Sequence, residues 1–169
     1  MNSFSLNPIS NKTICLVLYE NVVNTKFLKT LLQKGSLPAA LINANMILDA
    51  FQVLCAAAKA SHAVDNGCAK TRTFFTEILF RLSPSNKISD CFNLFGVSDD
   101  SSRFLLLCEK ENYTSIITQI QGDICDLSLL ESICNKELIK KSYKITENEL
   151  INNTLLNCVV SQMAVKEVR

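Results

Sequence analysis

The first third of the chain alternates between a continuous apolar run and a periodic one. Residues 13–19 (TICLVLY) are almost uninterrupted apolar positions, the pattern of a strand buried on both faces. Between Asn24 and Gly35, apolar residues recur at three- and four-residue spacing, and the glycine supplies a helix end. The pattern therefore predicts a strand followed by a short helix.

The middle of the chain is predicted to be helical. An alanine-rich segment from about Asn43 keeps a helical apolar period until Asn66-Gly67 ends it. A second helix is predicted over about 71–82, and a third over about 89–95. The apolar stripe expected on the alanine-rich helix consists of Ile47, Phe51, Leu54, Cys55 and Ala58.

The last third mixes strands and helices. Residues 103–108 (RFLLLC) predict a second buried strand, residues 124–127 a third, and residues 113–120 a short helix between them. Thr146 with Glu149 matches a capping box that opens a helix running to the C-terminal end. We expect one helix-rich α+β domain over residues 1–169, with central helices packed on a small sheet of about three strands.

Composition excludes several classes of protein. With 48% hydrophobic and 20% charged residues, the 169-residue chain can bury a core, and four Gly and three Pro leave no collagen-like or linker segment. No apolar run approaches the roughly 18 residues of a membrane span. We expect a soluble protein without a membrane partner and without a secretory signal at its start.

Charge is distributed unevenly although the formal net charge is only +1. Residues 59–87 hold five basic and two acidic side chains, whereas residues 99–131 hold two basic and seven acidic ones. A nearly neutral protein is therefore expected to present one basic face.

The chemistry-bearing residues do not form a catalytic pattern. The eight cysteines contain no C-x-x-C pair, His62 is the single histidine, and the four glycines are isolated. We read the cysteines as reduced core residues and predict no catalytic residue, no metal site and no cofactor. The sequence thus favours a binding protein over an enzyme.

Three cations offer a candidate site within the basic segment. Lys70 and Arg72 follow the Asn66-Gly67 turn, and Lys59 lies on the preceding helix. If the two helices form a hairpin, these three side chains approach one another and can meet a phosphate backbone. The alternative is a solvated charged rim with no ligand.

Several short strings give the chain a family resemblance. It resembles the PRPK-binding protein (TPRKB) family, most strongly over residues 41–98 and more weakly, but collinearly, at 16–18 and 163–168. The strings that carry the resemblance are FQVL (51–54), KTRT (70–73), TEI (76–78), LSP (82–84) and FGVS (95–98).

The resemblance implies a non-catalytic subunit of the KEOPS complex. Such a subunit binds the atypical kinase/ATPase (PRPK-like) subunit directly and other KEOPS subunits indirectly, and it captures the single-stranded 3′ end of tRNA. It thereby supports threonylcarbamoyl-adenosine modification of tRNA, and we expect it in cytoplasm and nucleus. Carried over to this sequence, the RNA-binding role falls on Lys59, Lys70 and Arg72.

For the kinase contact we select Pro84, Asn86 and Ile88, in the loop after the 71–82 helix. The alternative is that Ile88 packs internally against the start of the next helix.

Two other functions remain open from the sequence. A free-standing single-stranded RNA binder needs exposed aromatic platforms, and most of the twelve aromatic residues lie at core-facing spacing. A small thiol-dependent enzyme needs one cysteine that reacts far faster than the rest.

Overall fold

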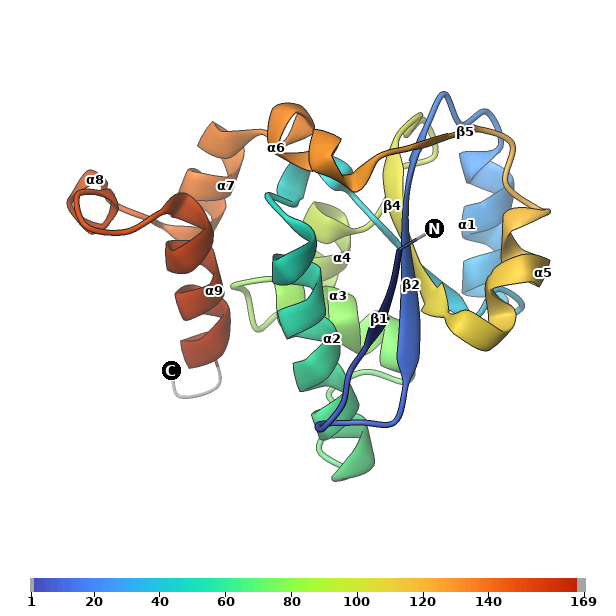
Figure 1. Ribbon diagram of the computed structural model, residues 1–169, viewed down its shortest axis with the longest axis horizontal. Helices are drawn as coiled ribbons and strands as arrows, with labels where there is room; N and C mark the ends of the chain where they lie inside the picture. Colours follow the sequence, from blue (N-terminus) through green and yellow to red (C-terminus); the bar gives the residue numbers. More distant parts are fainter. Residues whose placement is uncertain (1, 167–169) are drawn as a thin grey trace.

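The computed structural model describes residues 2–166, arranged as a sheet between two layers of helices (Figure 1). Val168, where the weaker C-terminal resemblance ends, lies outside the described residues. The strands are β1 (Asn2–Ser5), β2 (Thr13–Glu20), β3 (Ala39–Ile42), β4 (Phe104–Glu109) and β5 (Asp123–Cys125). The α-helices are α1 (Thr25–Gln33), α2 (Ala50–Asp65), α3 (Phe74–Leu82), α4 (Ile88–Phe95), α5 (Tyr113–Ile117), α6 (Leu130–Ile133), α7 (Lys136–Tyr143), α8 (Glu147–Leu150) and α9 (Leu155–Val165). Three 3-10 turns complete the described elements, at Ala44–Met46, Lys110–Asn112 and Leu127–Leu129.

The sheet is antiparallel throughout the described chain. Its main path has the order β1-β2-β4-β3, and β5 also pairs with β2. Because β1 lies opposite the first half of β2 and β5 opposite its end, the two short strands follow one another along one edge. The long strands β2 and β4 therefore form the centre of the sheet.

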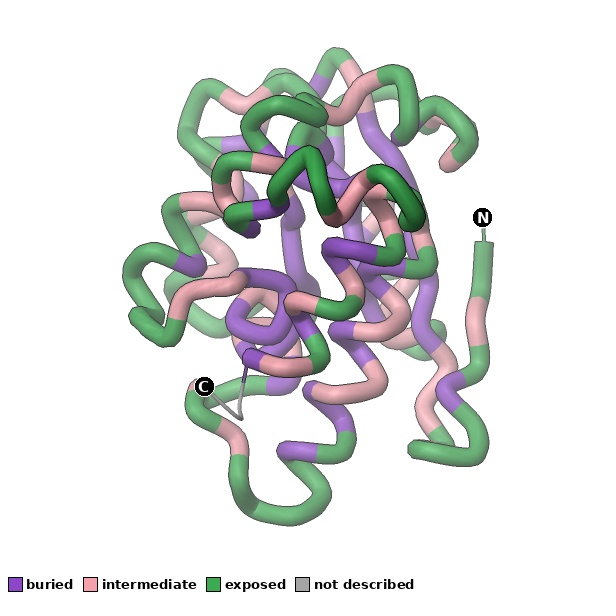
Figure 2. Tube along the Cα trace, turned by 90° about the vertical axis from the view of Figure 1, so that its left-hand side faces the viewer, coloured by how far each residue is buried: buried purple, intermediate pink, exposed green. Residues whose placement is uncertain are grey.

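Both faces of the sheet are covered, which explains the unbroken apolar runs of β2 and β4. In Figure 1, α1 and α5 lie on one side of the sheet and α2, α3, α4 and the C-terminal helices on the other. Side chains of β2 alternate between the two cores, with Ile14, Leu16 and Leu18 in the larger one and Cys15, Val17 and Tyr19 in the smaller one. Figure 2 shows that the buried parts of the chain lie mainly inside the molecule and that the exposed turns lie on the outside.

The predicted α+β domain is confirmed, but the expected sheet of about three strands was too small. The three predicted strands correspond to β2, β4 and β5, while β1 and β3 were missed. The sequence of β1 (NSFS) is mostly exposed and polar, and β3 (AALI) is four residues long and directly follows Pro38. Neither segment is long enough to establish a period by itself.

The central helix begins later than predicted and buries a different face. Asp49 caps it by accepting a hydrogen bond from the Phe51 amide at 2.7 Å, so α2 starts at Ala50 and not near Asn43. The predicted end is confirmed, because Gly67 adopts a positive φ of 66° after Asn66. Phe51 is largely exposed, and the residues that α2 buries are Gln52, Val53, Ala56, Ala57, Ala60, Ser61 and Ala63.

The predicted capping box at Thr146 and Glu149 is confirmed, but the helix that it opens is short. It caps α8, which ends at Leu150, and Thr154 then caps a separate helix, α9. Sequence reasoning also missed α7, which ends at Tyr143 and is followed by a C-cap residue, Lys144, in the left-handed conformation. The C-terminal third is thus a series of separate helices (Figure 1). Of these, α9 packs on α2, α6 and α7 contact the 3-10 turn at Ala44–Met46, and α7 and α8 contact α9.

Two sequence expectations concern the chain as a whole. All eight cysteines are free thiols, and the described residues bury or half-bury each of them except Cys68. Among residues 2–166, no helix combines the length and the apolar content needed to cross a bilayer.

Candidate functional site

The cationic loop, residues 66–73, connects α2 to α3 and carries two of the three predicted RNA-binding residues. Lys70 and Arg72 are both exposed on it, and neither side chain forms an ion pair within residues 2–166. Thr73 ends the loop as the N-cap of α3, in a reciprocal capping box with Thr76. The loop therefore exposes two cations immediately before the first residue of α3.

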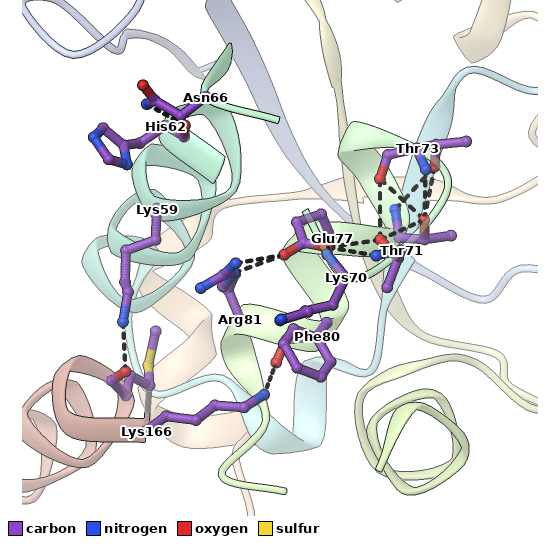
Figure 3. A network of polar contacts seen from close by, with 12 residues as sticks. Lys59, His62, Asn66, Lys70, Thr71, Thr73, Glu77, Phe80, Arg81 and Lys166 are labelled. Carbon is purple, nitrogen blue, oxygen red and sulfur yellow. Dashed lines mark hydrogen bonds and ion pairs between the residues drawn. The ribbon is translucent and has the colours of Figure 1, made fainter. Parts of the chain in front are cut away.

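Glu77 organises this loop from beneath (Figure 3). Its carboxylate is fully buried on α3, and Oε2 accepts hydrogen bonds from the Lys70 amide at 2.9 Å, the Thr71 amide at 2.9 Å and the Thr71 hydroxyl at 2.8 Å. The other oxygen, Oε1, accepts from Arg81 Nε at 2.7 Å and Nη2 at 2.7 Å. A buried carboxylate is tolerated here because all of its contacts are charge-assisted hydrogen bonds.

Lys59, the third predicted cation, lies on α2, the helix that precedes the loop. Its ammonium donates to the carbonyl oxygens of Met163, at 2.8 Å, and Ala164, at 3.4 Å, near the end of α9. Burial, together with the nearby charge of Arg81, lowers the pKa of Lys59. The structure thus brings Lys70 and Arg72 together on one loop and turns Lys59 toward the C-terminal helix.

A second lysine fastens α9 to α3. Lys166 is buried, its ammonium donates to the Phe80 carbonyl, and it lies 3.4 Å from the centroid of the Phe80 ring. Burial lowers the pKa of Lys166 to about 8, because the low-polarity surroundings disfavour the charged amine. Lys59 therefore connects α2 to the end of α9, and Lys166 connects the end of α9 to α3 (Figure 3).

A pocket of about 330 Å³ lies beside these contacts and contains the pair of residues that a thiol enzyme would use. Its polar lining includes His62 and Cys68, both exposed, together with Lys59 and Arg81. Among the described residues, no hydrogen bond joins the His62 ring to the Cys68 thiol. The pocket also contains two basic side chains, Lys59 and Arg81.

Most other thiols are placed where they cannot react easily. Burial raises the pKa of the thiol groups of Cys15, Cys55, Cys108, Cys125, Cys134 and Cys158. A raised pKa leaves the thiol protonated near neutral pH, and the thiolate is the reactive form. Among the described residues there is also no group of His, Cys, Asp and Glu side chains that can hold a metal ion.

The loop after α3 carries the three residues predicted for the kinase contact. Asn86 and Ile88 are exposed and Pro84 is half-buried. Hydrogen bonds hold this loop in place: the Ser85 amide donates to Ser83 Oγ at 3.1 Å, and the Cys91 thiol donates to the Ser85 carbonyl at 3.3 Å. These residues are therefore exposed on a loop whose conformation is held by hydrogen bonds.

Ile88 is partly exposed and partly covered, so the choice between a binding role and internal packing stays a prediction. It is the first residue of α4 and 41% exposed, and Phe92, one turn later, is 36% exposed. We call Pro84, Ile88 and Phe92 together the apolar strip. The sequence analysis missed Phe92, although its i,i+4 spacing from Ile88 was the signal that places both on one helix face.

Glu77, Arg81 and Lys166 were also missed as organising residues. The i,i+4 spacing of Glu77 and Arg81 on a predicted helix was a visible signal for an ion pair. Their burial was not visible, because it depends on α2 packing against α3. Lys166 had no local signal, since its partner Phe80 lies 86 positions earlier.

Comparison with known proteins gives consistent matches. The profile of a family described as kinase binding protein CGI-121 matches residues 19–167. The EKC/KEOPS complex subunit TPRKB of Danio rerio is 39% identical over 161 residues, which cover 92% of each chain. The EKC/KEOPS complex subunit cgi121 of Aspergillus fumigatus is 32% identical over 143 residues, covering 77% of this chain and 75% of that one. The Candida glabrata subunit CGI121 is 26% identical over 161 residues, 90% of each chain.

Proposed function

This chain belongs to the kinase binding protein CGI-121 family, and on that premise we propose that it is a non-catalytic subunit of a KEOPS complex that binds the kinase/ATPase subunit and the 3′ end of tRNA. The observation that carries the proposal is a family match over residues 19–167 together with relatives named as EKC/KEOPS subunits. In that role the chain supports threonylcarbamoyl-adenosine modification without performing a chemical step. We place it in cytoplasm and nucleus.

We propose the apolar strip for kinase binding. Ile88 and Phe92 expose large apolar side chains next to Pro84, and the loop that precedes them is hydrogen-bonded in place. An ordered apolar surface loses little conformational entropy when a partner covers it. Asn86, exposed at the rim, can supply a polar contact that sets the orientation of the partner.

We propose the cationic loop for RNA binding. Lys70 and Arg72 have no anionic partner among the described residues, so a phosphate group can pair with each. Lys59 contributes a third cation, because an ammonium has three protons and the α9 carbonyls occupy two of them. Phosphate contacts of this kind position the strand without reading its bases, in keeping with a ligand shared by many tRNAs.

The proposed function is tested with the purified chain, the kinase subunit and tRNA. We expect the two proteins to elute together in size-exclusion chromatography at micromolar concentration, and tRNA affinity to fall steeply with salt. Separate elution would refute kinase binding, and tRNA affinity independent of salt would refute the phosphate site. Hydrolysis of ATP by the chain alone, at a rate that survives further purification, would refute the non-catalytic role.

A further inference from the structure

We propose that Glu77 is a positioning residue for RNA: its buried carboxylate holds the cationic loop, from within the protein, in the conformation that presents Lys70 and Arg72 to the tRNA strand. This inference rests on the proposed RNA function and deepens it. It assigns a role in RNA binding to a residue that touches no RNA.

The first step is that one oxygen atom defines the loop backbone. The amides of Lys70 and Thr71 and the Thr71 hydroxyl all converge on Glu77 Oε2, at 2.9, 2.9 and 2.8 Å. The backbone at these two positions cannot rotate without breaking hydrogen bonds to a charged acceptor, which are stronger than neutral ones. The side chains of Lys70 and Arg72, on this same loop, are both exposed.

The second step is that Arg81 holds the carboxylate itself. Its Nε and Nη2 atoms both lie 2.7 Å from Glu77 Oε1. Arg81 therefore holds one carboxylate oxygen while the loop donates to the other. The guanidinium also offsets a negative charge that would otherwise oppose a phosphate near the loop. Glu77 can therefore order a cationic loop without weakening its attraction for an anion.

The third step concerns which groups remain for RNA. The amides of Lys70 and Thr71 are directed inward to Glu77 and are not available to a phosphate. Recognition consequently falls on the lysine and arginine side chains, and its strength depends on how often the loop holds them in place. A loop that is competent for only part of the time lowers the apparent affinity by that fraction.

Affinity for tRNA can be lost in two ways that differ in their dependence on salt. Removing a cation removes a phosphate contact, which makes the dependence of log affinity on log salt shallower by about 0.7. Loosening the loop leaves the same contacts in the bound state, so affinity falls while the slope stays unchanged. The slope thus distinguishes a contact residue from a positioning residue.

The experiment uses the full-length chain and tRNA with an intact, fluorescently labelled 3′ end. Affinity is measured by fluorescence anisotropy over a range of salt concentrations for Glu77→Gln and Thr71→Val. Glu20→Gln is the matched control, because it neutralises another ion-paired glutamate, 2.6 Å from Arg103 and remote from the loop. Hydrogen exchange at the Lys70 and Thr71 amides, followed by NMR, reports loop order without RNA.

We expect Glu77→Gln to weaken tRNA binding about tenfold and Thr71→Val about threefold, both with the wild-type salt slope. Exchange at the two loop amides should accelerate in both variants, kinase binding should be unchanged, and Glu20→Gln should behave as wild type. If Glu77→Gln does not fold, Thr71→Val decides the question by the same criteria.

Wild-type affinity in the folded variants would overturn the positioning role, and so would a shallower slope. The proposed RNA function has its own control, Lys70→Ala combined with Arg72→Ala. If that double variant loses affinity while Glu77→Gln and Thr71→Val do not, only the role of Glu77 is refuted. If the double variant binds as wild type, the RNA site itself is refuted and the role of Glu77 falls with it.

Discussion

The two ends of α3 carry two different surfaces, and the chain stabilises them in different ways. At the N-terminal end, a buried carboxylate and a capping box hold the cationic loop. At the C-terminal end, the Leu82 carbonyl accepts a hydrogen bond from the Tyr143 hydroxyl and the Phe80 carbonyl accepts one from Lys166. The apolar strip begins directly after that end.

The difference follows from the direction of the helix. The N-terminal amides of a helix favour a negative partner and its C-terminal carbonyls favour a positive one. Here the acidic Glu77 lies in the first turn of α3, and Lys166 donates a hydrogen bond to the Phe80 carbonyl in its last turn. One buried helix of nine residues can thereby support an exposed cationic surface at one end and an exposed apolar one at the other.

The largest expected effect comes from Arg81, which lies in the last turn of α3 and pairs with Glu77 in the first turn. Arg81→Met leaves the fully buried Glu77 carboxylate without its cation, and we expect the free energy of unfolding to fall by about 3 kcal/mol. Urea unfolding followed by circular dichroism measures it. Arg103→Met is the matched control, because it removes an exposed ion pair and should cost less than about 1 kcal/mol. Equal stabilities of the two variants would contradict the account.

The next effect sharpens the assignment of the apolar strip. Ile88→Glu places a charge at the centre of the proposed kinase contact and should weaken kinase binding about 30-fold, measured by calorimetry. Binding of tRNA should not change. Val23→Glu is the control, since Val23 is an exposed apolar residue on α1's side of the sheet. A folded Ile88→Glu protein with wild-type kinase affinity would remove the strip from the interface.

A smaller effect concerns pH at the C-terminal end of α3. The pKa of Lys166 is lowered from 10.5 to about 8, so between these values the unfolded chain binds more protons than the folded one. The unfolding free energy of wild type, relative to Lys166→Met, should therefore rise by on the order of 2 kcal/mol between pH 8 and pH 10. Below pH 8 the cost of burying the charge is fully present.

Urea unfolding at several pH values measures this difference. Groups that both proteins share, such as Cys108 and Tyr143, whose pKa values burial raises, cancel in the comparison. The same measurement on Lys141→Met, which removes an exposed lysine, gives the baseline with which the Lys166→Met result is compared. A flat difference for Lys166→Met would show that its amine carries no burial penalty.

The smallest effect is the loss of one phosphate contact at the cationic loop. Three contacts predict a slope of log affinity against log salt of about −2, and Arg72→Ala should reduce it to about −1.3. A salt titration of tRNA binding measures the slope. Lys34→Ala removes an exposed lysine at the end of α1 and should leave the slope at its wild-type value. Equal slopes for Arg72→Ala and wild type would mean that Arg72 contacts no phosphate and belongs to a solvated charged rim.

The sequence predicted the parts of the fold that have strong local signals. The long strands β2 and β4 are continuous apolar runs, and the helix ends at Gly67 and Pro84 are marked by residues that break helices. The short strands β1 and β3 were missed because each has four residues and depends on pairing with a neighbour. The buried face of α2 was wrong because alanine packs closely against α3 and α9, while Phe51 stays outside.

In the candidate sites, too, residues with a local signal in the sequence were found, and residues that act through distant contacts were missed. Lys70, Arg72, Pro84 and Ile88 were chosen because charge, turn residues and resemblance mark them locally, and their roles stay predictions. The residues that hold the two surfaces in place were not found, because a hydrogen bond from Tyr143 to Leu82 joins positions 61 residues apart. Only the tertiary structure brings such partners together.

The central claim is that opposite ends of α3 serve two separate partners. It is tested most directly by measuring kinase and tRNA affinity side by side for Ile88→Glu and Arg72→Glu. The account predicts that Ile88→Glu loses kinase binding and keeps tRNA binding, and that Arg72→Glu does the reverse. If either folded variant loses both affinities, or if both variants keep both, the two ends of α3 are not separate binding surfaces.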